Sequence, residues 1–178
     1  ACDTLTGRMF AESDKKRRNR FQVAYTGPEC SKWWAALVLF IYDTGTRIGA
    51  TLKIEPADID LERGFVMLRC DAAKTGVEQL QRLSPQTVAA IREIYDPKAK
   101  RLFYWGLSRT IQGSLGSILD KAGLPNGRES KFHRIRKTTA TLTAAAGRRD
   151  LAQSTLGHTT AAMTDDRYID RRAMPIAS

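Results

Sequence analysis

The chain has 178 residues, which is enough for one domain with a buried core, and its 42% hydrophobic and 27% charged residues are typical of a globular protein. The 29 Lys and Arg residues against 19 Asp and Glu residues give a net charge of +10, which favours nucleic acid as a partner before anionic membranes. The longest apolar run, residues 33–42, is too short to span a bilayer and predicts a buried helix instead.

The N-terminal stretch is strongly basic and resembles no targeting signal. It has neither a signal-peptide pattern nor an initiator methionine, so we expect the chain to be a fragment of a longer protein. The charge run at 12–20 favours a solvated tail or linker, with an arm that tracks a nucleic-acid backbone as the alternative. Three cysteines without metal-ligand spacing are typical of a reduced, cytoplasmic compartment.

The first half of the domain predicts one helix followed by strands. The helix begins at Pro28, whose fixed φ suits a first turn, and ends near Gly45, which can cap it. Residues 57–70 predict two strands joined by a turn. Residues 71–83 predict a further turn, around Lys74–Gly76, and a third strand.

The second half predicts helices. Ser84 and Pro85 supply the cap and the first-turn residue of a helix over 84–95. The other helical segments are predicted at 108–123, 133–147, 148–157 and 160–168. The whole pattern indicates a mainly α domain with one small antiparallel β-sheet (α+β).

Metal and nucleotide chemistry are disfavoured by the motifs. The two histidines, His133 and His158, are 25 residues apart, and no pair of cysteines or histidines has ligand spacing. No phosphate-binding loop of the nucleotide-hydrolase type is present. We therefore expect no metal and no cofactor.

Six residues stand in short motifs suited to phosphate-ester chemistry. They are Arg47 in TGTRIG, Lys74 in AKTG, His133 and Arg136 in HRIR, His158 in LGH, and Tyr168 in RYID. In this order they resemble the catalytic domain of the tyrosine recombinase (phage integrase) family, over residues 30–172. The resemblance implies the DNA breaking-rejoining catalytic fold at 29–178, after a basic arm or linker at 1–28. It implies a site-specific recombinase or integrase that acts on double-stranded DNA.

The resemblance also implies a role for each arginine and histidine. The planar forks of Arg47 and Arg136 would hold non-bridging phosphate oxygens and counter the charge of the transition state. His158 would donate one more hydrogen bond to the same oxygens. His133, one helical turn from Arg136, would orient the phosphate or take up the proton of the nucleophile.

Cleavage itself would need a nucleophile and an acid. Tyr168 would attack phosphorus to form a 3′-phosphotyrosine, which conserves the bond energy without ATP or metal. Lys74, on a turn and with a tunable pKa, would protonate the departing 5′ oxygen.

Two positions depart from the family's pattern. The family commonly has an acidic residue three positions after the first arginine, where this chain has Ala50, so Arg47 must be braced by something else. In most members the tyrosine stands nine positions after the LGH histidine, whereas in this chain Tyr168 stands ten positions after His158. An extra residue inside a helix would turn Tyr168 by about 100°, while a loop would absorb it.

Two alternatives share this fold. A type IB topoisomerase would use a similar centre to relax supercoils, and a non-catalytic DNA-binding module would keep the fold without the chemistry. For a recombinase, we expect a monomer that assembles on DNA as a multimer, a tetramer by resemblance, with no membrane partner.

Overall fold

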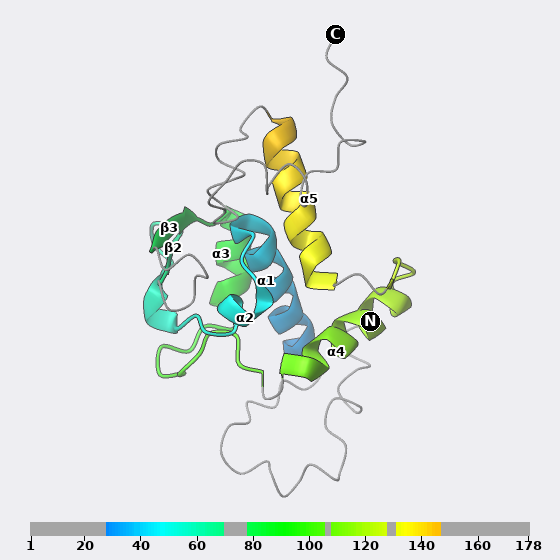
Figure 1. The fold of residues 1–178 in the computed structure, drawn as a ribbon. Coiled ribbons are helices and arrows are strands. Elements are labelled where there is room, and N and C mark those ends of the chain that lie inside the picture. Colours follow the sequence, from blue (N-terminus) through cyan, green and yellow to red (C-terminus); the bar gives the residue numbers. More distant parts are fainter. Residues whose placement is uncertain (1–27, 70–77, 106–107, 128–130, 147–178) are drawn as a thin grey trace, which may run out of the picture.

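The computed structural model describes residues 28–69, 78–105, 108–127 and 131–146 (Figure 1). This part of the chain is mainly helical with one small antiparallel sheet, which confirms the predicted fold class. Its elements are, in chain order, α1 (Pro28–Thr44), α2 (Ile48–Thr51), the 3₁₀ helix η4 (Pro56–Asp58), β1 (Ile59–Asp60), β2 (Phe65–Leu68), β3 (Gln79–Arg82), α3 (Pro85–Arg92), α4 (Ser108–Lys121) and α5 (Lys131–Ala145).

Helix α1 is the centre of the core. It packs against α3 on one side and α5 on another (Figure 1). Apolar side chains occur around most of its circumference, as expected of a helix enclosed by other elements. The apolar α1 side chains that are almost completely buried are Cys30, Trp33, Trp34, Ala36, Leu37, Phe40 and Ile41. Burial of this set, at about 1.5–3 kcal/mol for each large side chain, fixes α1 as the frame on which the other elements are positioned.

The ends of two helices follow the local sequence signals. Gly45 adopts a left-handed φ of 58°, and its N–H donates to the carbonyl of Ile41 at 2.8 Å, so α1 ends at the predicted glycine. Ser84 caps α3 by accepting a hydrogen bond from the N–H of Thr87. Both predicted boundaries are confirmed.

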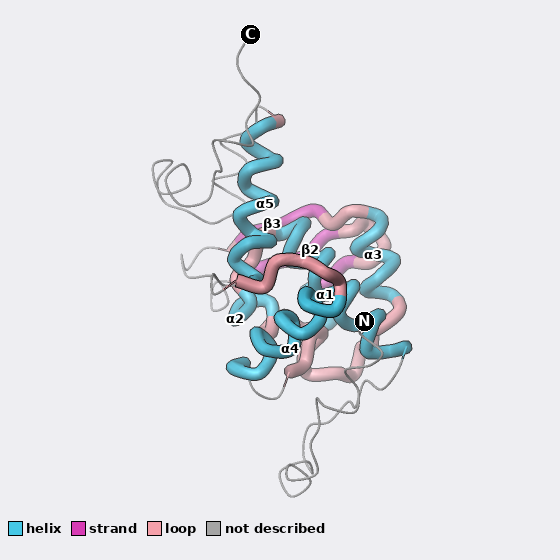
Figure 2. Tube along the Cα trace, turned by 90° about the vertical axis from the view of Figure 1, so that its right-hand side faces the viewer, coloured by secondary structure: helices cyan, strands magenta, loops and turns pink. Residues whose placement is uncertain are grey.

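The sheet has three antiparallel strands in the order β1-β2-β3, shown side by side in Figure 2. Gly64, at φ 69°, turns the chain between β1 and β2. The pairing of β2 with β3 reaches Leu68 and Gln79, so the predicted third strand is confirmed. The predicted turn around Lys74–Gly76 lies outside the described residues.

The middle of α4 is in direct contact with the start of α5. Lys131, at the start of α5, extends its ammonium group over Gly116 and donates to the carbonyl of Gln112 at 3.2 Å. A Cβ at Gly116 would lie 2.1 Å from the Lys131 Nζ, the flexible end of the lysine, so the glycine leaves room for this ammonium contact. The segments predicted helical at 148–157 and 160–168 lie outside the described residues. Within the described ranges, no helix is long and apolar enough to cross a bilayer.

Candidate functional site

The C-terminal end of α1 is held by two side chains from α5. Arg136 is 3% exposed, and its Nη1 donates to the carbonyl of Gly45. Thr139 Oγ1 donates to the carbonyl of Tyr42 at 2.7 Å. The last carbonyls of a helix lack partners within it and form the negative end of its dipole, so a guanidinium and a hydroxyl are suitable groups there. α5 is therefore fixed in position against α1 by polar bonds as well as by packing.

Arg47 follows Gly45 by two residues and precedes α2. Its backbone is extended, at φ −72° and ψ 142°, and its side chain is exposed. Its carbonyl accepts hydrogen bonds from the N–H groups of Ala50 and Thr51, at 2.8 and 2.9 Å. Arg136 thus contacts the same tight turn, residues 44–47, from which the Arg47 guanidinium projects into solvent.

His133 lies on α5 one turn before Arg136, as predicted. The two side chains differ in exposure, because His133 is exposed while Arg136 is buried against α1. The structure therefore brings three of the six predicted site residues to the junction of α1, α2 and α5. The other three, Lys74, His158 and Tyr168, lie outside the described residues.

Three buried threonines at this junction escaped the sequence-based prediction. Thr44, Thr46 and Thr51 are at most 7% exposed, and their hydroxyl oxygens form a chain with separations of 2.9 and 2.8 Å. Thr44 Oγ1 also donates to the carbonyl of Phe40 at 2.7 Å. Thr51 Oγ1 donates to the carbonyl of Arg47 at 3.2 Å. The chain of hydroxyls therefore joins the end of α1 to the start of α2.

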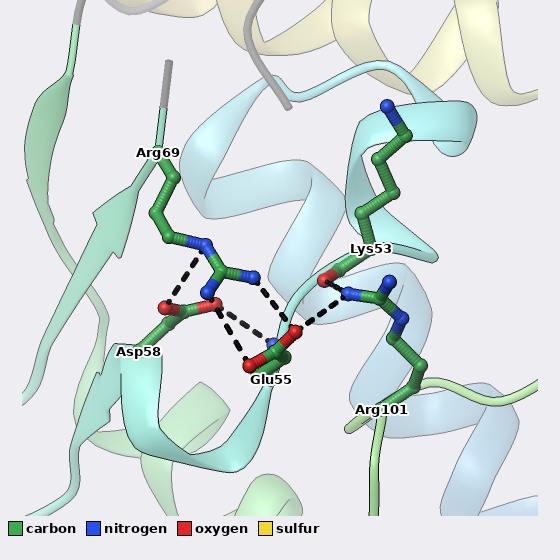
Figure 3. Close-up of polar contacts among 5 residues, drawn as sticks. All are labelled: Lys53, Glu55, Asp58, Arg69 and Arg101. Carbon is green, nitrogen blue, oxygen red and sulfur yellow. Dashed lines mark hydrogen bonds and ion pairs between the residues drawn. The ribbon is translucent and has the colours of Figure 1, made fainter. Parts of the chain in front are cut away.

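An ionic cluster fixes the segment that follows α2 (Figure 3). Glu55 accepts from Arg69 at 2.9 Å, just after β2, and from Arg101 at 3.0 Å. Arg69 also faces Asp58 at 3.5 Å, and Arg101 donates to the carbonyl of Lys53. The cluster joins three parts of the chain far apart in sequence, and Arg69 stands at the beginning of the connection from β2 to β3.

The cluster predicts a pH-dependent contribution of Glu55 to stability. The hydrogen bond from Arg69 is the main cause that lowers the pKa of Glu55 below its ordinary 4.5, with Arg69 and Arg101 charges acting in the same direction. A carboxyl whose folded pKa is lowered stabilises the fold above its unfolded pKa and loses that contribution as pH falls through the folded one. Glu55→Gln should therefore lower the melting temperature at pH 7, and the difference from the parent should shrink below about pH 4.5.

The matched control for this prediction is Glu62→Gln. Glu62 is 93% exposed and lies 3.8 Å from Arg92, so its ion pair should contribute little at any pH. Thermal melts of the three proteins between neutral and acidic pH measure the effect. If the melting temperature of Glu55→Gln differed from that of the parent by the same amount at every pH in this range, the stabilising effect of Glu55 would not be ionic.

Among the described residues, no group of three or more His, Cys, Asp or Glu side chains could hold a metal ion. Among the polar side chains at the α1–α2–α5 junction, Arg136 and the three threonines are buried and bonded within the protein, whereas Arg47 and His133 are exposed. A guanidinium can bind phosphate oxygens, so the exposed side of the junction can meet a phosphate through Arg47.

The family model for the phage integrase family matches residues 21–174, and the chain belongs to this family. That range includes all six predicted site residues, and it confirms the resemblance deduced from the motifs. No curated protein sequence matches the chain.

Solved structures share the fold. The XerA recombinase superposes with a TM-score of 0.66 at 22% identity, over 80% of this chain and 54% of its own. The Tn1549 transposon integrase in complex with circular intermediate DNA gives 0.63 at 18% identity, over 90% of this chain and 66% of its own. The XerH site-specific recombinase bound to its palindromic difH substrate gives 0.62 at 19% identity, over 95% of this chain and 47% of its own. The chain thus spans about half the length of the two Xer recombinases.

Proposed function

We propose that this chain is the catalytic part of a site-specific DNA recombinase, which cleaves and rejoins strands through a 3′-phosphotyrosine intermediate. The observation that supports it best is the docking of α5 on the end of α1. The hydrogen bond from Arg136 to Gly45 holds the helix that bears His133 and Arg136 against the turn that bears Arg47. Family membership adds the expectation that the remaining motifs belong to the same centre.

The two arginines act on the non-bridging oxygens of the scissile phosphate. The Arg47 guanidinium projects into solvent and can meet the phosphate directly. The Arg136 guanidinium has five N–H donors in a rigid plane, and the bond to Gly45 occupies one nitrogen, so this bond also fixes the plane of the fork. A cation held in one orientation lowers the energy of the added negative charge more than a flexible one does, and the bond to Gly45 orients Arg136 in this way.

The remaining groups move protons and form the covalent bond. Tyr168 gives up its phenolic proton, with His133 as the acceptor, while its oxygen bonds to phosphorus. The bond from phosphorus to the 5′ oxygen breaks as Lys74 protonates that oxygen, and His158 donates to a non-bridging oxygen. Attack of a 5′ hydroxyl on the phosphotyrosine reverses the sequence and rejoins the strand, so no metal or cofactor is needed.

The domain assignment and the partners follow from this role. Residues 29–178 form the catalytic domain, and residues 1–28 form a basic arm or linker. The net charge of +10 favours double-stranded DNA as the partner. The chain acts as a monomer before it binds DNA and as a multimer, in the family's manner a tetramer, once two sites are paired. A DNA substrate and an odd number of cysteines favour a cytoplasmic location for this activity.

Covalent capture tests the function. The chain is incubated with random-sequence duplexes that carry a nick near the middle, so that the short cleaved strand dissociates and the adduct cannot be resealed. Adducts that survive denaturation are isolated, their DNA is sequenced, and the modified residue is mapped by mass spectrometry. A phosphotyrosine at position 168 is the expected result. Binding without any adduct would instead favour the non-catalytic module, and relaxation of supercoiled plasmid by the chain alone would favour a type IB topoisomerase.

Lys74→Ala should show a defect that depends on the leaving group. A 5′-bridging oxygen needs a proton to depart, whereas a 5′-bridging sulfur departs readily without one. On the captured sequence, Lys74→Ala should lose at least ~10²-fold in cleavage of the oxygen substrate and cleave the sulfur substrate almost as fast as the parent. The measurement is the ratio of the two rates, in which modest changes in folding or DNA affinity cancel.

Arg47→Ala is the control for that ratio. The charge on the non-bridging oxygens is the same in both substrates, so this variant should be slow on both. If Lys74→Ala were equally slow on both substrates, Lys74 would bind or position the phosphate instead of protonating the leaving group.

A further inference from the structure

We infer that the buried hydroxyls of Thr44, Thr46 and Thr51 are the brace of Arg47, and that they act as positioning residues for strand cleavage. The inference deepens the proposed function, because it rests on the role of Arg47 at the scissile phosphate. The chain has Ala50 three positions after Arg47, so no carboxylate is available there to hold the guanidinium.

The need for a brace follows from the surroundings of Arg47. Its side chain is exposed, and within the described ranges it makes neither an ion pair nor a hydrogen bond. The backbone from which it projects then determines which region the guanidinium can reach. That backbone is the short linker 45–47 between α1 and α2, and α2 has four residues, too few to be stable by itself.

The hydroxyl chain spans this linker from end to end. It begins at the Phe40 carbonyl inside α1, passes through Thr44 and Thr46, and reaches Thr51 in α2. Thr51 Oγ1 returns to the carbonyl of Arg47 itself, at 3.2 Å. The N–H of Thr46 also donates to Thr44 Oγ1 at 3.3 Å. A shift of the Arg47 backbone would therefore break buried hydrogen bonds, which have no water to replace them.

Counting protons identifies Thr46 as the central member. The chain has four contacts, two between hydroxyls and one to a carbonyl at each end, but three hydroxyls supply only three protons. The Thr44 and Thr51 hydroxyls each donate to a carbonyl, so the single proton of Thr46 serves both contacts between hydroxyls and can be donated to either neighbour. Loss of the Thr46 hydroxyl removes both of these contacts and divides the chain.

Hydrogen exchange tests the brace without DNA. Thr46→Val keeps the β-branched shape and removes the hydroxyl, and Thr87→Val is the matched control, because Thr87 is also fully buried and contacts the Ser84 hydroxyl at 3.0 Å. The amides of Ala50 and Thr51 should exchange about five- to tenfold faster in Thr46→Val than in the parent. The exchange rates of these two amides should be unchanged in Thr87→Val, and they should return to the parental values in Thr46→Ser. Equal exchange at Ala50 and Thr51 in the two valine variants would overturn the inference.

Cleavage of the captured duplex tests whether the brace acts through Arg47. Thr46→Val should reduce the rate of adduct formation about tenfold at saturating DNA, with DNA affinity unchanged, because a small displacement of a charged group costs rate rather than binding. In an Arg47→Ala background the same substitution should have no further effect. A tenfold loss in both backgrounds would show that the hydroxyls act elsewhere and would overturn the inference. Unimpaired cleavage by Arg47→Ala alone would instead overturn the role of Arg47 in the proposed function, while hydrogen exchange would still decide whether the hydroxyls hold the turn.

Discussion

Tyr168→Phe is expected to abolish the covalent DNA adduct and to leave DNA binding unchanged. On the proposed function, the substitution removes the phenolic oxygen that bonds to phosphorus, and a phenyl ring has no group to replace it. The arginines and the basic surface that bind the phosphate backbone remain. Adduct formation should therefore fall below detection, the largest effect of any single substitution, while the gel-shift affinity at fixed salt stays the same.

Tyr95→Phe is the matched control for this experiment. The Tyr95 hydroxyl donates to the carbonyl of Pro56 at 3.2 Å, so its loss removes a phenol from the fold but not from the proposed centre. This variant should form the adduct at the parental rate. An adduct that persisted in Tyr168→Phe would assign the nucleophile to another residue, and the ten-residue spacing from His158 would then explain why Tyr168 is not used.

Arg136→Lys should lose at least ~10²-fold in cleavage, because a single amine cannot reproduce a planar fork and removal of a transition-state donor typically costs that much. DNA affinity should change far less, since many other basic residues share backbone binding. The buried position adds a second consequence. The Gly45 carbonyl loses its guanidinium donor, which should reduce the free energy of unfolding by about 1–3 kcal/mol.

Thr139→Val separates the loss of cleavage from the loss of stability that we expect in Arg136→Lys. It removes the other hydrogen bond from α5 to the end of α1, the one to the Tyr42 carbonyl, and leaves Arg136 in place. It should reduce the stability by about 1 kcal/mol and affect cleavage by far less than the arginine substitution. The measurements are denaturant unfolding and single-turnover cleavage. Equal losses of cleavage and of DNA affinity in Arg136→Lys would make Arg136 a DNA contact only.

The elements of the fold could be predicted because their signals are local. A proline at a first turn, a glycine after the last turn and a serine before α3 act on neighbouring backbone, so the ends of α1 and α3 were predictable at Gly45 and Ser84. The apolar pattern indicated that α1 is buried, and the order of the site motifs indicated the family. These features depend on a few adjacent residues or on their order.

The bracing of the site depends on contacts that no local pattern specifies. The polar face of α5 gave no sign that Arg136 is buried, because periodicity shows which side of a helix is apolar but not which neighbour covers it. The threonine chain was missed because Thr51 is separated from Thr44 and Thr46 by a change of helix. The Glu55 cluster joins residues up to 48 positions apart in the sequence. What replaces a carboxylate near Arg47 could therefore be seen only in three dimensions.

The bonds from α5 to the end of α1 have a consequence for synthesis of the protein. They join residues 91 and 97 positions apart in the chain, so they cannot form until translation has passed α5. A nascent chain that has completed α1, the sheet and α3 still lacks the guanidinium that binds the Gly45 carbonyl, although the threonine contacts within residues 40–51 can already form. On the proposed function, a polypeptide whose α5 has not yet left the ribosome would lack Arg136 at the end of α1 and would be unable to cut DNA.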